Sequence, residues 1–232
     1  MSAPRDEPTE ILLIHAFQQI QRNEFILNNI LGEGAFASVH QGSWKNEPVA
    51  VKVVRFHGSP ENKQKIKDIF YADLEVLSKL RHPRVVTLLG ACLEMPQSEG
   101  NGAALIMELM ERGSLDVLLH SSPASEYRPS SDLARLRCAL DIAEGMRFLH
   151  SCRLIHRDLK SGNVLVDGEG RCKICDFGLS RFRGTLSHVS GVIGTVAWTA
   201  PEILSDPDEP SKDSVVSQQS LNLIQLSCYE CF

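Results

Sequence analysis

The stretch LIHRDLKSGNVLV, residues 154–166, crowds charged and basic side chains between two apolar runs. The residues concerned are His156, Arg157, Asp158 and Lys160, with Asn163 close behind. A solvated surface turn is the commonest explanation for such a cluster. The alternative is a loop that arranges an acid, a cation and an amide around a phosphate group. Only the rest of the sequence decides between these two interpretations.

The composition is that of a globular protein, because 43% of the 232 residues are hydrophobic and 23% are charged. This length is enough for one large domain or for two small lobes with a core. The formal net charge of −5 gives no reason to expect binding to nucleic acid or to an anionic membrane. No apolar run reaches the ~20 residues that span a bilayer, and the acidic N-terminus is unlike a secretory signal. We therefore expect a cytoplasmic protein without a membrane span.

Seven cysteines, an odd number, in a chain without a secretory signal argue against a disulfide framework. Two Cys-x-x-Cys pairs, Cys172/Cys175 and Cys228/Cys231, raise zinc binding as an alternative. The sequence RCKICDF around the first pair is typical of a strand, in which positions three apart point to opposite faces. A shared metal ion is therefore disfavoured.

The first half of the chain predicts a small, mostly antiparallel sheet with one helix. Apolar residues at helical spacing predict an amphipathic helix over 10–22 and a second helix over 63–80, ended by Pro83. Alternating and β-branched patterns predict strands at 24–30, 38–44, 47–56, 84–93 and 103–109.

The second half is mainly helical. A short helix is expected over 114–120 and a long, buried one over 132–151. The apolar stripe of the long helix consists of Leu133, Leu136, Leu140, Ala143, Met146 and Leu149. The segments 163–166 and 172–175 flank the turn DGEG and predict a hairpin. Two lobes, one rich in strands and one helical, are expected to meet near 108–112.

Four further segments carry glycine or charged residues. The glycine loop GEGAFASV (32–39) lies between two strands, whereas dinucleotide fingerprints and P-loops open a helix. A plain hairpin turn is the alternative to a loop that covers a phosphate. Lys52 lies in the apolar strand VAVK, as a snorkelling residue or as a buried cation for a phosphate. Asp176 in CDFGLS follows a strand, and the segment TAPE (199–202) comes later.

The glycine loop, the strand lysine, HRDLKSGN, DFG and APE occur in this order, and together they resemble the protein kinase family over residues 25–204. HRDLKSGN with GTVAWTAPE is similar to the tyrosine-kinase-like branch of the serine/threonine kinases. The resemblance implies an α+β, bilobal protein-kinase-like fold and transfer of the ATP γ-phosphate to a protein hydroxyl. The alternative is a nucleotide-binding pseudokinase, or an inactive fragment that acts as a binding module.

The resemblance also implies the catalytic residues. Asp158 would orient the substrate hydroxyl and accept its proton, and Lys160 accompanies it in the serine/threonine class. Asn163 and Asp176 would hold Mg²⁺, which requires hard oxygen ligands. Lys52 would contact the α- and β-phosphates of ATP.

The implied nucleotide site takes residues from both lobes. The backbone of 32–37 would cover the phosphates, Met107 would lie behind the adenine, and the segment 108–110 would offer it backbone groups. The residues expected to bind the nucleotide are Leu31, Gly32, Gly34, Phe36, Val39, Ala50, Lys52, Met107, Glu108, Met110, Asn163, Leu165 and Asp176.

Two residues of the charged stretch are expected to have other roles in the family. His156 would be a packing residue. Arg157 would pair with a phosphate on the segment 176–202, a charge-assisted contact. An upstream kinase would place that phosphate on one of four hydroxyls, those of Thr185, Ser187, Ser190 and Thr195.

The sequence departs from the family pattern in three places. Ala37 replaces the third glycine of the loop. Counted back from RHP (81–83), the family position of the helix glutamate that pairs with the strand lysine is occupied by Asp73. Glu75 lies about 200° further round the helix, so Asp73 is the expected partner of Lys52.

The third departure follows TAPEILSD, where the usual helical continuation is absent. We therefore expect an incomplete C-terminal lobe, with marginal folding, little catalysis and partly exposed Leu136 and Leu140. The expected segments are 1–24 (amphipathic), 25–107 (N-terminal lobe), 108–204 (hinge and partial C-terminal lobe) and 205–232 (atypical tail).

Overall fold

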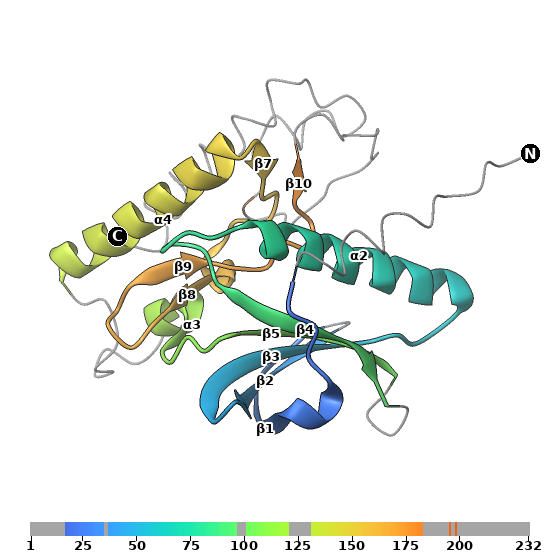
Figure 1. The fold of residues 1–232 in the computed structure, drawn as a ribbon. Helices are drawn as coiled ribbons and strands as arrows, with labels where there is room; N and C mark the ends of the chain where they lie inside the picture. Colours follow the sequence, from blue (N-terminus) through green and yellow to red (C-terminus); the bar gives the residue numbers. More distant parts are fainter. Residues whose placement is uncertain are drawn as a thin grey trace, which may run out of the picture. The chain divides into compact units, whose positions relative to one another are not determined.

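The computed structural model describes residues 17–34, 37–96, 101–120, 131–182, 195 and 198. The chain divides into two compact units, and the chain passes between them at residues 81/82, 86/87 and 109/110. The first unit contains residues 1–81 and 87–109, and the second contains 82–86 and 110–232. The predicted α+β class is confirmed, since the first unit holds a sheet and one helix and the second adds two helices among the described residues (Figure 1).

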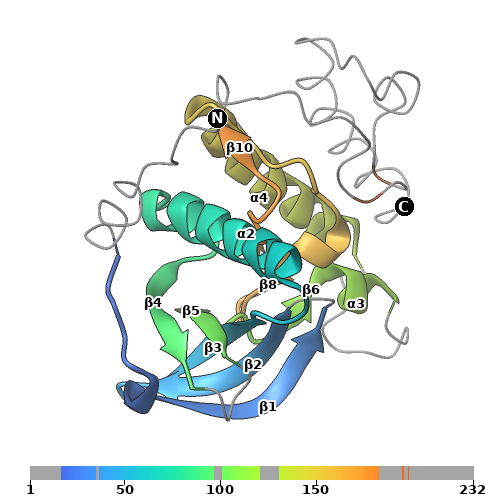
Figure 2. The same cartoon turned by 90° about the vertical axis from the view of Figure 1, so that its right-hand side faces the viewer.

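The first unit is built on a five-stranded antiparallel sheet in the order β1-β2-β3-β5-β4 (Figure 2). Its strands are β1 (Phe25–Glu33), β2 (Ala37–Trp44), β3 (Glu47–Arg55), β4 (Leu88–Met95) and β5 (Gly102–Glu108). Alternate residues of β3, namely Val49, Val51 and Val53, are buried in a cluster with Trp44 and Ile106. The β-branched pattern of this strand therefore fills the core on one face of the sheet.

Helix α2 (Pro60–Lys79) packs against β3 and β4 (Figure 1). It begins three residues before the predicted position, because Ser59 caps it by accepting a hydrogen bond from the Asn62 N–H at 3.3 Å and Pro60 occupies its first turn. It ends at Lys79, where Leu80 is already extended, so Pro83 is not what ends it. Its buried apolar side chains are Ile66, Phe70, Leu74, Val76 and Leu77.

The segment before β1 corrects the prediction of a helix over 10–22. Residues 10–16 lie outside the described residues. From Gln18 the chain instead runs along the edge of β4: the Ile20 N–H donates to the Ala91 carbonyl at 2.9 Å, and the Ala91 N–H donates to the Gln18 carbonyl at 3.0 Å. A short 3-10 turn, η1 (Arg22–Glu24), follows. An unpaired sheet edge offers hydrogen bonds that outweigh the helical periodicity of these few residues, and Ile20 becomes 1% exposed.

We expect Gly90→Ala to weaken the first unit. A Cβ at position 90 would overlap the Gln18 backbone oxygen and the Ile20 side chain, whereas a Cβ at Gly32 meets nothing within 4 Å. Losing the burial of Ile20 costs about 2 kcal/mol. Urea denaturation should therefore show a free energy of unfolding lower by about that amount for Gly90→Ala, and unchanged or slightly higher for Gly32→Ala. Equal unfolding curves for both variants would contradict the pairing of the N-terminal segment with β4.

Most of the described helices and strands of the second unit are short. They are β6 (Gly113–Ser114), α3 (Leu115–His120), α4 (Asp132–Ser151), β7 (Leu154–Ile155), η3 (Ser161–Asn163), β8 (Val164–Val166), β9 (Cys172–Ile174) and β10 (Arg181–Phe182). The predicted hairpin is present as β8 and β9, with β6 on the outer side of β8, and β10 pairs with β7. Helix α4 packs against β7 and β9 (Figure 1). Among the described residues, no helix is long and apolar enough to cross a lipid bilayer.

Helix α4 has the predicted bounds, but its buried face differs from the predicted stripe. The buried residues are Cys138, Asp141, Ile142, Gly145, Met146 and Leu149. Leu133, Leu136 and Leu140 are more than half exposed, and Ala143 is exposed too. The apolar residues of the N-terminal half thus lie on a different side of the helix from those of the C-terminal half. The expected exposure of Leu136 and Leu140 is present.

The predicted strand over 84–93 begins only at Leu88. Residues 84–86 belong to the second unit, where the Val86 N–H donates to the Ile174 carbonyl at 3.0 Å and the Ile174 N–H donates to the Arg84 carbonyl at 2.9 Å. The apolar Val85 and Val86 are therefore buried beside β9, and not in the sheet of the first unit.

Candidate active site

A buried ion pair joins β3 to α2 in the first unit. The Lys52 Nζ lies 2.7 Å from the Asp73 Oδ2, and the side chains are 19% and 3% exposed. Glu75 turns away and pairs with Lys79 at 2.6 Å on the exposed side of the helix. The structure therefore pairs the two residues that the resemblance to the family implies, and the shorter aspartate reaches the lysine directly.

We expect Asp73→Ala to be much more damaging than Glu75→Ala. Removing Asp73 takes the anionic partner from a largely buried cation and should lower the free energy of unfolding by about 2 kcal/mol, less than the 3–5 kcal/mol of fully buried pairs. Glu75→Ala removes an exposed pair at i and i+4 and should cost about 0.5 kcal/mol or less. Urea denaturation of both variants measures the difference. Similar losses for both would contradict the assignment.

Four residues expected at the nucleotide lie on one face of the sheet. Val39 is the register partner of Lys52, and Ala50 is the register partner of Met107. Directly opposed residues of neighbouring strands share a face, and residues two apart on β3 share it too. The first unit thus presents Val39, Ala50, Lys52 and Met107 together.

Of the four nucleotide candidates in and beside the glycine loop, the structure describes three. Leu31 is 52% exposed on β1, and Gly32 pairs with Val39. Gly34 follows β1 and donates its N–H to the Ala37 carbonyl at 2.8 Å, which closes the loop. Phe36 lies outside the described residues.

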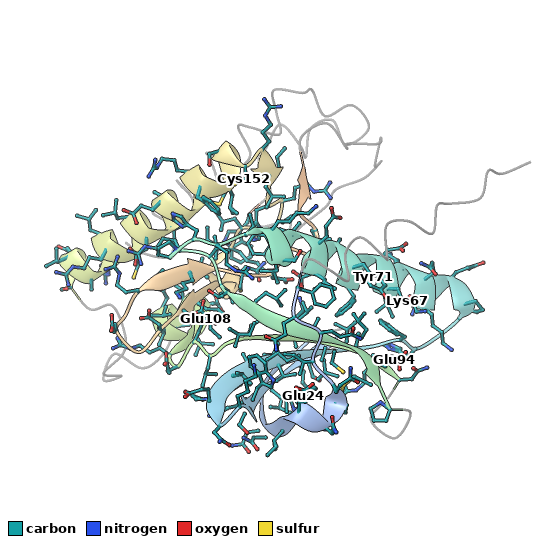
Figure 3. All side chains as sticks on the ribbon, viewed as in Figure 1. Glu24, Lys67, Tyr71, Glu94, Glu108 and Cys152 are labelled. Carbon is teal, nitrogen blue, oxygen red and sulfur yellow. The ribbon has the colours of Figure 1, made fainter. Side chains whose placement is uncertain are left out.

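Glu108 ends β5, and its position is fixed by the segment before β4 (Figure 3). Its carboxylate accepts a hydrogen bond from the Thr87 N–H at 2.7 Å, and its own N–H donates to the Thr87 carbonyl at 3.1 Å. Met110 begins the next stretch of the second unit and is buried, and its carbonyl accepts from the Gly113 N–H at 3.1 Å. Glu108 and Met110 are therefore each held by hydrogen bonds within their own unit.

In the second unit, Asp158 is surrounded by hydrogen-bond donors. Its Oδ1 accepts from the backbone N–H of Thr195 at 2.9 Å and from the Thr195 hydroxyl at 2.7 Å. Its Oδ2 accepts from the Asn163 Nδ2 at 2.9 Å and lies 3.0 Å from the Lys160 Nζ. The carboxylate is thus fixed in orientation by three residues of different types.

Thr195, which the sequence offers only as one of four candidate phosphate acceptors, makes contacts in the site that the sequence did not predict. Its hydroxyl donates to Asp158 and also accepts from the Lys160 Nζ at 2.7 Å. These hydrogen bonds connect Thr195 to two residues of the HRDLKSGN segment. The signal that could have located it is its place in GTVAWTAPE, shortly before the APE motif. The other three acceptor candidates, Thr185, Ser187 and Ser190, lie outside the described residues.

His156 is a packing residue with no exposed surface. Its Nδ1 accepts from the Asp158 N–H at 3.3 Å, so its Nε2 carries the proton and donates to the Cys175 carbonyl at 3.0 Å. Its ring lies 5.1 Å from that of Phe177, which is fully buried. The histidine therefore ties the loop of Asp158 to the segment that carries Asp176.

Two residues of the site have a left-handed backbone, which is costly for residues other than glycine. They are Arg157 at φ 67° and Asp176 at φ 64°. Arg157 donates from its Nε to the Leu179 carbonyl at 2.7 Å, which holds it against the segment after DFG. Such strain is typical of sites at which the surrounding contacts fix the backbone.

Asn163 and Asp176 are brought together by the backbone. The N–H of Cys175, which precedes Asp176, donates to the Asn163 carbonyl at 3.0 Å. The Nδ2 of Asn163 donates to the Asp158 carbonyl at 2.7 Å and to its carboxylate, so the amide oxygen takes no part in these two bonds. An amide and a carboxylate oxygen are hard donors that suit Mg²⁺. Leu165 lies nearby on β8, where it pairs with Ser114 and Lys173.

The strand that leads to Asp176 is anchored by the buried Asp141 of α4. The Arg171 guanidinium donates to both carboxylate oxygens, at 2.8 and 3.0 Å, and the Cys172 N–H donates at 3.0 Å. Arg84 lies 3.1 Å away. Burial raises the pKa of Asp141, while the Cys172 N–H and the Arg84 charge act in the opposite direction. This network fixes β9 to α4.

Cys172 begins β9 and Cys175 directly follows it, and the two side chains differ in exposure. Cys172 is buried, and Cys175 is partly exposed. Within the described ranges no group of three or more His, Cys, Asp or Glu residues lies close enough to hold a metal ion. Cys228 and Cys231 lie outside those ranges.

Comparison with known proteins places most of the chain in one family. Residues 25–216 match the family model described as protein tyrosine and serine/threonine kinase. Serine/threonine-protein kinase CTR1 of Arabidopsis thaliana is 37% identical over 193 residues, which cover 81% of this chain and 22% of that protein.

Two further relatives are similar over the same part of the chain. The probable serine/threonine-protein kinase SIS8 of Arabidopsis thaliana is 36% identical over 86% of this chain and 18% of its own length. The probable serine/threonine-protein kinase drkC of Dictyostelium discoideum is 36% identical over 90% of this chain and 27% of its own length. The chain thus spans about a quarter or less of the length of these curated relatives.

Proposed function

Because the chain belongs to the protein tyrosine and serine/threonine kinase family, we propose that it transfers the γ-phosphoryl group of ATP to a serine or threonine hydroxyl of a protein. One observation carries the proposal. In the HRDLKSGN loop, Asp158 is held by Thr195, Asn163 and Lys160, and this leaves a carboxylate whose orientation is set before a substrate binds. Preorganised groups of this kind supply most of the catalysis in phosphoryl transfer.

Each charged residue then has a separate task. Asp158 orients the substrate hydroxyl and accepts its proton. Lys160 places a positive charge 3.0 Å from that carboxylate and helps to fix its orientation. Lys52, fixed by Asp73, neutralises the charge of the α- and β-phosphates.

Asn163 and Asp176 fit a magnesium ion through their oxygen atoms, and they would hold it in this protein. Mg²⁺, when bound, neutralises the charge on the phosphate oxygens. The Cys175–Asn163 backbone bond keeps Asn163 beside the residue that precedes Asp176.

The serine/threonine class is supported by Lys160, two residues after Asp158, and by the Thr195 hydroxyl that both residues bind. The three relatives are serine/threonine-protein kinases by name, which agrees with this class. The protein substrate is therefore proposed to offer an aliphatic hydroxyl. A tyrosine substrate would present a phenol several ångströms further from its backbone.

The proposal is tested by incubating the purified chain with γ-labelled ATP, Mg²⁺ and a generic basic protein substrate. We expect label in phosphoserine and phosphothreonine, and none after EDTA is added. Asp158→Asn is the matched control for a contaminating kinase. Nucleotide binding without transfer, or label in phosphotyrosine alone, would overturn the proposal.

A further inference from the structure

A hydrogen bond outside the familiar motifs ties α3 to the catalytic loop. The Ser161 hydroxyl donates to the Asp116 Oδ1 at 2.9 Å. Ser161 has no exposed surface, whereas the Asp116 side chain is 45% exposed at the start of α3. A buried hydroxyl that loses its acceptor costs about 1–3 kcal/mol, so this bond restricts where Ser161 lies.

Ser161 begins the 3-10 turn η3, and this turn ends with Asn163. The Asn163 N–H closes the turn by donating to the Lys160 carbonyl at 2.9 Å, and its carbonyl accepts from the Cys175 N–H. Displacing Ser161 therefore moves the start of a three-residue turn whose last residue holds Asp158. The Asp116–Ser161 bond is thus connected to Asn163 and Asp158 through one three-residue turn.

Asp116 itself is anchored by its neighbours. The Ser114 hydroxyl caps α3 by accepting from the Val117 N–H at 3.3 Å, and Ser114 pairs with Leu165 of β8. His120, one turn on, has its Nδ1 2.9 Å from the Asp116 carbonyl and 3.5 Å from the Asp116 Oδ1. These contacts fix the carboxylate relative to β8, the strand that follows η3.

We propose that Asp116 is a positioning residue, which acts through Ser161 to hold η3 and thereby sets the positions of Asn163 and Asp158. The proposal rests on the proposed kinase function, and it adds a residue that touches neither nucleotide nor substrate. Because the contacts that start at Asp116 end at Asn163, substituting Asp116 should affect the proposed Mg²⁺ site.

The test uses Asp116→Ala, Ser161→Ala, the double variant and Asp116→Asn. Asparagine keeps an Oδ1 that accepts the Ser161 hydrogen bond. Asp132→Ala is the matched control, since Asp132 also lies in the first turn of a helix and its side chain is 99% exposed. Phosphoryl transfer is measured as a function of Mg²⁺ concentration, and amide hydrogen exchange is measured across 158–176.

We expect the apparent KM for Mg²⁺ to rise about tenfold in Asp116→Ala and in Ser161→Ala. The double variant should show about the same tenfold change rather than about a hundredfold, because both substitutions remove one bond. Asp116→Asn and Asp132→Ala should resemble the unmodified chain. The amides of Asn163 and Cys175 should exchange faster in Asp116→Ala, with or without Mg²⁺.

Multiplicative effects in the double variant, or loss of thermal stability with an unchanged KM for Mg²⁺, would overturn the positioning role. Failure of asparagine to restore the unmodified behaviour would overturn it too. The exchange measurement needs no catalysis. If the unmodified chain transfers no phosphate, faster exchange at Asn163 still supports the proposal, and unchanged exchange overturns it.

Discussion

Asp158→Asn is expected to lower phosphoryl transfer by about 10²–10⁴-fold, the usual contribution of a general base. The amide retains an oxygen that accepts from the Thr195 N–H and hydroxyl, as Oδ1 does now. It cannot accept the substrate proton at neutral pH. The rate of label transfer from ATP to a protein substrate measures the loss.

The same variant should change binding and stability little. Its new amide nitrogen would face Lys160 and Asn163, which are both donors to the carboxylate, so a decrease of about 1–2 kcal/mol in the free energy of unfolding is expected. Nucleotide affinity, followed by a thermal shift with ATP and Mg²⁺, should stay within a few-fold. Turnover close to that of the unmodified chain would show that Asp158 is not the base.

Asp176→Asn is expected to abolish Mg²⁺-dependent nucleotide binding, with affinity reduced by more than about 100-fold. Loss of an outer-shell partner of a metal ligand already costs 10–100-fold, and this substitution removes the charge of a proposed ligand. Asparagine tolerates the left-handed backbone that Asp176 adopts at φ 64°. The effect therefore reports the loss of charge and not a change of backbone.

The prediction for Asp176→Asn is tested by measuring nucleotide binding at several Mg²⁺ concentrations. Asp132→Asn, which removes the same charge from an exposed position of the second unit, should bind as the unmodified chain does. Retained Mg²⁺ dependence in Asp176→Asn would mean that another residue holds the ion. Asp158→Asn and Asp176→Asn thus separate turnover from binding.

The sequence predicted best what local patterns or ordered motifs determine. Helix α4 has its predicted bounds because Ser131 caps it, accepting from the Ala134 N–H at 3.2 Å. The pairing of Lys52 with Asp73 was predictable because Asp73 stands at the family's helix position and the helical turn points Glu75 elsewhere. Both depend on spacing along one element.

What the sequence could not predict depends on contacts between distant segments. The Asp158–Thr195 bonds span 37 residues, and no spacing along a single element predicts them. The pairing of Gln18 and Ile20 with Ala91 overrides a helical periodicity that is present in the sequence. The bond between Asp116 and Ser161 joins positions 45 apart, and neither residue type is unusual in its place.

The second unit takes in residues 82–86, far ahead of the rest of its chain, and this bears on folding during synthesis. Every residue of the first unit has left the ribosome soon after Leu109, so that unit can fold early. Arg84 and Val86, however, bind to Ile174, which is synthesised 90 residues after Arg84 (174 − 84). At about 5–20 residues per second, this short apolar segment waits roughly 5–18 s for its partner strand. During that interval Val85 and Val86 lack the partner strand beside which they are buried in the folded protein.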